Sequence, residues 1–187
     1  KSEKLLEKQG NKFSGLDKYL FLLDKFPKNK RVISKIQEFR IFIEGADLNP
    51  SSEDMNKIMY LFNNNNFKEV INLCKNKLLV FPNSYLVWNI LGVSFAKLDQ
   101  WREAQISLKK AIYFHPLKAS LHNDLGKIFL YQKQYENAII CFEKSIFLDQ
   151  KLEVAIFNIA IAYNEFDKKD KAINYFKKCV ELNTKND

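Results

Sequence analysis

The chain has 187 residues, of which 47% are hydrophobic and 28% are charged, with only five glycines and four prolines. This composition excludes collagen-like and disordered chains and favours a helical protein, because the turns of an all-β chain need more glycine and proline. The formal net charge is +8, but nearly all of it comes from scattered lysines rather than arginines, so nucleic-acid binding is not expected.

The first clear element in chain order is "RVISKIQEFRIFI" at residues 31–43. Its apolar residues recur at helical spacing, which predicts an amphipathic helix with Ile33, Ile36, Phe39 and Ile43 on one face. The segment "EGADLNPSSED" follows and predicts a turn, after which Ser51 and Asp54 supply a capping start for the next helix.

From residue 51 onward, the same pattern returns every 34 residues. Its positions in the best-defined copy are Trp88, Leu91, Gly92, Phe95, Ala104, Leu108, Ala111 and Pro116. Each copy contains two amphipathic runs separated by a short polar break, and each run has the helix period. We therefore predict four helix pairs, over residues 51–84, 85–118, 119–152 and 153–187.

The residue types at these positions have a packing explanation. Two antiparallel helices approach closely only where a small side chain lies at the crossing, so Gly92, Gly126 and Ala160 are expected there, against the alanines of the second helices. Proline ends the second helices because it lacks an N–H group. The run Asn63–Asn66 predicts a turn between helices, since asparagine tolerates left-handed geometry.

The pattern W-x2-LG-x2-F-x8-A-x3-L-x2-A-x4-P at residues 88–116 resembles the tetratricopeptide repeat. The resemblance implies an all-α fold, a right-handed superhelical solenoid of antiparallel helix pairs. Residues 8–27 resemble the second helix of a further repeat, with Gly10, Gly15, Tyr19 and Pro27 at suitable offsets. Residues 1–50 are therefore expected to form a degenerate N-terminal repeat plus the extra helix.

The same resemblance implies that the first helix of each pair lines a concave groove that binds a peptide or a partner protein. An asparagine falls at one of two adjacent groove positions in every unit: Asn56, Asn89, Asn123 and Asn158. Lys127 and Tyr131 are further expected groove residues. The asparagines resemble the ladder in the repeats of protein O-glycosyltransferases, although here the ladder is staggered. The alternative is that asparagine is simply plentiful in this chain.

The sequence offers few candidates for catalysis. His115 lies at a helix end, and His122 occupies the position of Trp88 one repeat later, which favours a packing role. No catalytic motif, metal-ligand spacing or cofactor motif is present, so we expect a non-catalytic module with no metal and no cofactor. Three cysteines (Cys74, Cys141 and Cys179) are expected as buried thiols in a reducing, cytoplasmic compartment, and no apolar run is long enough to cross a membrane.

The final helix is expected to expose an apolar face at Ile173, Phe176 and Val180. An uncovered face at the end of a solenoid favours association, either with a second copy or with a following domain. The repeat region also resembles those that precede sulfotransferase, glycosyltransferase and oxygenase domains in some bacterial proteins. Two hypotheses follow: an interaction scaffold, or a docking or dimerising arm of a larger enzyme. Nucleic-acid binding through the lysines is a third alternative.

Overall fold

The computed structural model describes residues 19–23, 25–26, 29–44 and 49–183. The chain divides into two compact units, residues 1–48 and 49–187. In the first unit, helix α2 (Lys30–Glu44) covers the segment expected to be amphipathic, and the side chain of Asn29 caps it by accepting from the backbone N–H of Arg31 at 3.0 Å. Gly10, Gly15 and Pro27 lie outside the described residues.

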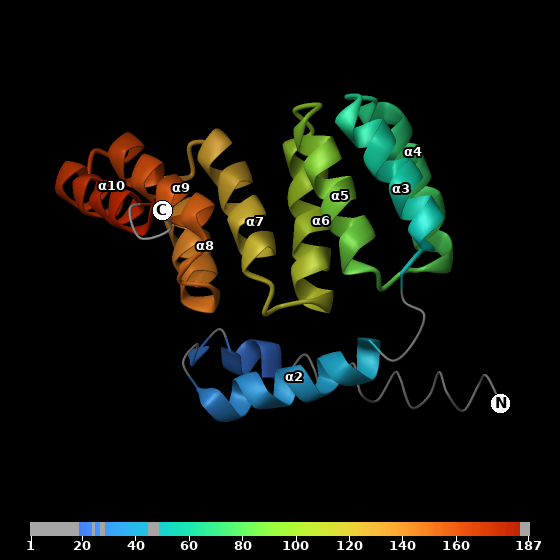
Figure 1. Ribbon diagram of the computed structural model, residues 1–187, viewed down its shortest axis with the longest axis horizontal. Helices are drawn as coiled ribbons and strands as arrows, with labels where there is room; N and C mark the ends of the chain where they lie inside the picture. The colour runs from blue at the N-terminus through green and yellow to red at the C-terminus, as the bar shows by residue number, and fades with distance from the viewer. Residues whose placement is uncertain (1–18, 24, 27–28, 45–48, 184–187) are drawn as a thin grey trace. The chain divides into compact units, whose positions relative to one another are not determined.

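The second unit is a stack of antiparallel helix pairs (Figure 1). Within its described residues, the helices are α3 (Ser52–Asn63), α4 (Phe67–Val80), α5 (Tyr85–Ala96), α6 (Trp101–Phe114), α7 (Ala119–Tyr131), α8 (Tyr135–Leu148), α9 (Glu153–Glu165) and α10 (Lys169–Asn183). Each helix contacts the next one along the chain, and the described residues contain no strand. The predicted all-α solenoid of helix pairs is confirmed.

The turn inside each pair has the same geometry in all four copies. A residue in left-handed conformation, with φ between 56° and 60°, lies between the two helices of each pair: Asn65, Asp99, Lys133 and Asp167, spaced 34 residues apart. The asparagine run at 63–66 is such a turn, as predicted. Asparagine and aspartate tolerate this conformation better than lysine does, so one turn of the four has an unfavourable residue.

The expected close approach at the helix crossings is present. A Cβ atom added to Gly92 would lie 2.8 Å from Cγ of Leu108 and 3.2 Å from the carbonyl oxygen of Ala104. At Gly126 the nearest neighbour is the ring of Phe142, whose Cε1 would lie 2.6 Å from the added Cβ, so at both glycines the closest side chain is larger than the expected alanine. At the crossing of α7 and α8, the ring of Phe142 therefore packs directly on the Cα atom of Gly126. Phe142 occupies the position that Leu108 has one repeat earlier.

The core of the second unit is continuous from pair to pair. Ile58, Val70, Leu91 and Leu108 belong to one buried cluster, and Ala138, Phe142, Ile159 and Ala172 belong to a second. Phe129 of α7 packs against both clusters. Such burial across pairs is necessary because a single pair cannot cover its own apolar faces.

Helix α3 begins with the predicted cap. The hydroxyl oxygen of Ser51 accepts a hydrogen bond from the backbone N–H of Asp54 at 3.2 Å. The acidic side chains of Glu53 and Asp54 in the first turn face the positive end of the helix dipole, which adds to the stability of this end.

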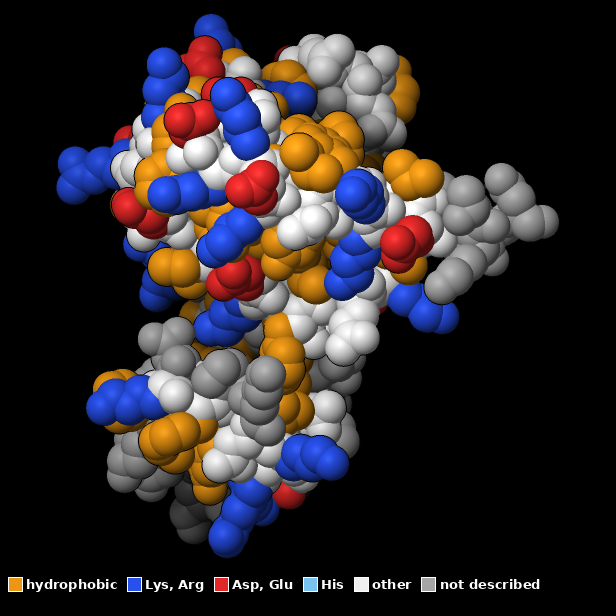
Figure 2. All heavy atoms as spheres, turned by 90° about the vertical axis from the view of Figure 1, so that its left-hand side faces the viewer, with side chains coloured by type: hydrophobic (Ala, Val, Ile, Leu, Met, Phe, Trp, Pro, Cys, Tyr) orange, Lys and Arg blue, Asp and Glu red, His pale blue; other side chains and the backbone are white. Residues whose placement is uncertain are grey.

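The last pair leaves apolar side chains in contact with solvent. Val154 of α9 is 55% exposed, and Ile173 and Val180 of α10 are 50% and 62% exposed. Phe176 is only partly exposed because its ring packs edge-on against Phe157, with the ring centroids 5.8 Å apart. Figure 2 shows the end of the second unit that holds α10, where apolar side chains lie between lysines and acidic residues.

Candidate functional site: the inner face of the repeat stack

The first helices of the last three pairs lie on the same side of the stack and contact one another in sequence. Helix α5 contacts α7, and α7 contacts α9, whereas among the described residues no comparable contact joins α6 to α8 or α8 to α10. The side formed by α5, α7 and α9 is therefore the more closely packed, inner side of the curve. We call it the inner face, and all but one of the predicted groove residues lie on its three helices.

Two of the predicted groove asparagines are joined to each other. The Nδ2 atom of Asn158 donates a hydrogen bond to Oδ1 of Asn123 at 2.8 Å. Asn123 is only 5% exposed, so Asn158 is the more accessible member of the pair. The two residues are 35 positions apart, one more than the repeat, so it is the stagger of the asparagines that brings them together.

Asn89 lacks the corresponding partner. It occupies the position of Asn123 one repeat earlier, and the residue 35 positions beyond it is Asp124. An ionised carboxylate has no proton to donate. In the described part of the chain, Oδ1 of Asn89 is buried without a hydrogen-bond partner. The remaining predicted asparagine, Asn56, is exposed on α3 and is not joined to the others.

Asp124 instead forms an ion pair with Lys127 one turn later on α7. Nζ of Lys127 donates to Oδ1 of Asp124 at 3.1 Å, and the side chains are 39% and 17% exposed, respectively. The charge of Lys127 is thus balanced inside the inner face. Partial exposure limits the contribution of such a pair to the free energy of unfolding to less than about 1 kcal/mol.

A pocket of about 380 Å³ opens beside this ion pair, between α5, α6 and α7. Val93 and Ile128 provide apolar lining, and Trp101 and Tyr131 form an aromatic wall. The two rings are stacked, with centroids 5.7 Å apart and an interplanar angle of 26°. Tyr131, a predicted groove residue, is 69% exposed.

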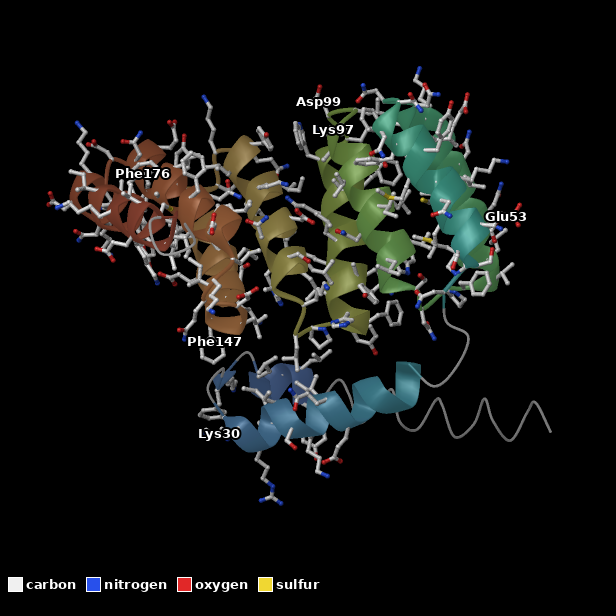
Figure 3. All side chains as sticks on the ribbon, in the orientation of Figure 1. Lys30, Glu53, Lys97, Asp99, Phe147 and Phe176 are labelled. Carbon is white, nitrogen blue, oxygen red and sulfur yellow. The ribbon has the colours of Figure 1, made fainter. Side chains whose placement is uncertain are left out.

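Lys97 and Asp99 complete the rim of the pocket at the turn between α5 and α6. Figure 3 shows both at the end of α5 where that turn begins. Trp101 was not among the site residues predicted from the sequence. A signal was present, because aromatic residues recur at the first position of the second helix, at Phe67, Trp101 and Tyr135.

His122 and the two cysteines Cys74 and Cys141 lie in environments that suppress reactivity. Burial lowers the pKa of His122 to about 4, so the ring is neutral near pH 7. Burial raises the pKa of the Cys74 thiol to about 12 and that of Cys141 to about 11.

Among the described residues, no three His, Cys, Asp or Glu side chains are grouped as metal ligands. Within the described residues, no helix is both long and apolar enough to span a membrane.

The stacked helix pairs, with their first helices on one inner face, define an α-helical repeat solenoid. Residues 119–152 and 154–186 each match the family description of the tetratricopeptide repeat. Tetratricopeptide repeats are therefore present at residues 119–152 and 154–186, and the motif at residues 88–116 resembles the same repeat.

Curated proteins and solved structures are similar to this chain over different lengths. Anaphase-promoting complex subunit 6 of Arabidopsis thaliana is 26% identical over 111 residues, which are 57% of this chain and 20% of that protein. The peroxisomal targeting signal receptor of Candida albicans is 28% identical over 109 residues, 55% of this chain and 17% of that protein. The chain therefore spans a fifth or less of these relatives.

A solved structure of MamA from Desulfovibrio magneticus RS-1 matches with a TM-score of 0.68 at 16% identity. The match covers 92% of this chain and 97% of that one. At this identity the likeness shows the fold alone. It agrees with the helix-pair stack described above.

Proposed function

We propose that the second unit is a non-catalytic interaction module that binds an extended peptide or a segment of a partner protein along its inner face. The observation that supports this most directly is the composition of that face. It combines hydrogen-bonding carboxamides and a balanced ion pair with an open aromatic pocket beside them, to which α6 also contributes. Such a mixture of apolar surface and a few oriented polar groups is typical of binding sites.

Asn158 is the polar group best placed to contact a bound segment. One N–H of its carboxamide is directed to Asn123, which leaves its oxygen and second N–H for a ligand backbone. Asn123, which is nearly buried, holds the orientation of Asn158. The role proposed for Asn123 is therefore positioning, and the roles proposed for Asn158, Lys127 and Tyr131 are contacts.

The names of the relatives agree with this proposal. One is a subunit of a multiprotein complex and another is a receptor for a targeting signal. The match covers a small part of each relative, so the partner of this chain is not transferred from them.

The proposal is tested by selecting peptides from a phage-displayed random library against the full chain and measuring their affinity by fluorescence anisotropy. Asn158→Ala and Lys127→Ala are expected to weaken binding by roughly 1–3 kcal/mol each, as expected for a lost hydrogen-bonding group. Asn72→Ala and Lys109→Ala, which change exposed residues on the second helices α4 and α6, are the matched controls. Equal affinities for all four variants would reject the inner face as the binding surface.

Asn158→Ala also leaves Oδ1 of Asn123 without its donor, so its stability must be measured alongside its affinity. The variant is informative at temperatures where circular dichroism shows it to be folded. Lys127→Ala provides an independent test of the inner face, because the ion pair that it removes contributes little to the free energy of unfolding.

A second candidate is self-association through α10, favoured by the exposure of Ile173 and Val180. The combined substitution Ile173→Glu with Val180→Glu is expected to shift sedimentation toward the monomer. Ile106→Glu is the control, because Ile106 is equally exposed, at 52%, on α6. Sedimentation of the unchanged chain as a monomer at every concentration would remove this candidate.

The alternative function is a docking or dimerising arm of a transferase or oxygenase. Such an arm would use the same inner face and the same exposed side of α10. The binding experiment therefore tests both uses of the inner face. The reading frame that encodes the chain distinguishes them, because an arm is encoded together with its catalytic domain.

A further inference from the structure

We propose that the pocket between α5, α6 and α7 receives an uncharged aromatic side chain of the bound segment. This inference rests on the proposed function and names the side chain that the inner face selects. It is supported by the shape of the pocket, by its charges and by its position beside Lys127.

The shape favours a flat, apolar group. The pocket volume of about 380 Å³ lies within the usual range for side-chain and small-ligand sites, roughly 300–1,000 Å³. Val93 and Ile128 offer apolar contact, and the stacked rings of Trp101 and Tyr131 offer a planar wall. Because Tyr131 is 69% exposed, its ring has surface available for a further ring in offset or edge-on contact.

The charges around the pocket cancel. Asp124 and Lys127 already neutralise each other at 3.1 Å. Lys97 and Asp99 on the opposite rim are both exposed and have opposite charges, and neither forms an ion pair within the described part of the chain. A charged ligand group of either sign would meet two lysines and two aspartates, so it would gain little net attraction to offset the loss of its hydration. An uncharged ring loses little hydration on entering the pocket, so this balance of charges favours it over a charged group.

The position links the pocket to the inner face. Lys127 and Asp124 belong both to the rim of the pocket and to α7, the middle helix of that face. A segment that passes Asn158 and Lys127 can therefore direct one side chain between Trp101 and Val93.

The chain provides an internal reference for the test, because it contains only two tryptophans. Trp101 lines the pocket, whereas Trp88 lies outside it with its indole N–H hydrogen-bonded to the carbonyl oxygen of Pro82 at 2.7 Å. The two indole resonances in a ¹H–¹⁵N spectrum of the full chain are assigned with Trp101→Phe. Titration then uses N-acetyl-tyrosinamide, N-acetyl-leucinamide, N-acetyl-argininamide and N-acetyl-aspartate amide as probes.

We expect N-acetyl-tyrosinamide to shift the Trp101 resonance in a saturable manner and to leave that of Trp88 in place. Tyr131→Ala is expected to weaken this binding by roughly fivefold or more. Tyr60→Ala is the matched control, since Tyr60 is 68% exposed on α3, outside the pocket. Equal responses to the arginine or aspartate probe, or no effect of Tyr131→Ala, would overturn the inference.

The probes are single residues, so their binding does not depend on the capture of any peptide. Failure of every library peptide with successful tyrosinamide binding would reject the proposed function and retain the pocket. Selected peptides that lack aromatic residues and bind Tyr131→Ala normally would reject the pocket assignment and retain the proposed function.

Discussion

The Nε2 atom of His122 lies 2.8 Å from the carbonyl oxygen of Pro116, and this contact repeats the one between Trp88 and Pro82 one repeat earlier. In the earlier copy the indole Nε1–H donates at 2.7 Å. The imidazole of His122 takes over that role with Nε2–H as donor. A histidine is therefore accepted at a tryptophan position because it supplies the same N–H group at the same place.

This relationship predicts a pH-dependent stability. Burial lowers the pKa of folded His122 from 6.5 to about 4, so between these values the unfolded chain binds the proton and the folded chain does not. The stabilisation is complete above pH 6.5, declines as pH falls, and is lost near pH 4, a total of about 3 kcal/mol. Urea unfolding at several pH values measures it. His122→Gln keeps an N–H donor without titrating, and it should unfold with a smaller pH dependence; an equal dependence would contradict the assignment.

Gly126→Ala is expected to destabilise the chain by about 1–3 kcal/mol, because the new Cβ would overlap the fully buried ring of Phe142. The better helix propensity of alanine offsets about 1 kcal/mol of that loss. Chemical denaturation measures the change. The double variant Gly126→Ala with Phe142→Leu reproduces the leucine that faces Gly92 one repeat earlier, so it should lose less stability than the two single changes added together. Strict additivity would show that the two positions do not interact.

Lys133→Gly is expected to stabilise the chain by about 1 kcal/mol. Lys133 has φ of 58° in its turn, a conformation that glycine adopts without steric conflict and lysine does not. The midpoint of thermal unfolding provides the measurement. Lys110→Gly makes the same chemical change in the interior of α6, where it should destabilise by about 1 kcal/mol. If both variants lost stability, the left-handed turn would not be the cause.

The three cysteines are expected to differ in reactivity toward a thiol reagent at pH 8. Cys74 is fully buried with a pKa raised to about 12, Cys141 is partly buried with a pKa raised to about 11, and Cys179 has a smaller shift. Because the thiolate is the reacting form, Cys179 should react first and Cys74 only on unfolding. Cys179→Ser should remove the fastest phase. A fast phase that survives this substitution would place the reactive thiol elsewhere.

Features that repeat with the 34-residue period were predictable from the sequence. Gly92 and Gly126 lie at helix crossings and the asparagine run forms a left-handed turn, because each depends on local geometry and on contacts within one pair. Ser51 caps α3 for the same reason. The substitution of histidine for tryptophan at 122 was predicted as packing, and the structure adds the hydrogen bond.

Relationships between neighbouring pairs were harder to predict. The stack of Trp101 on Tyr131 joins the start of α6 to the end of α7, and its geometry depends on how far one pair is offset from the next. The bond between Asn123 and Asn158 depends on the same offset. Sequence periodicity gives the position of a residue within its own pair, but not the distance between equivalent positions in adjacent pairs. The roles of the groove residues in binding remain predictions.

The Asn123–Asn158 hydrogen bond also has a mechanical consequence, because it crosses from one repeat to the next on the inner side. Opening of the terminal α9–α10 pair away from α7 must break it, whereas bending of α9 within its own pair need not. A bound segment that contacts Asn158 would oppose this opening on the inner side, and the packed core already opposes it on the other side. Occupancy of the inner face and docking of the final pair are thereby thermodynamically linked, and a bound segment would slow amide exchange in α9 and α10 as well as in the helices that it touches.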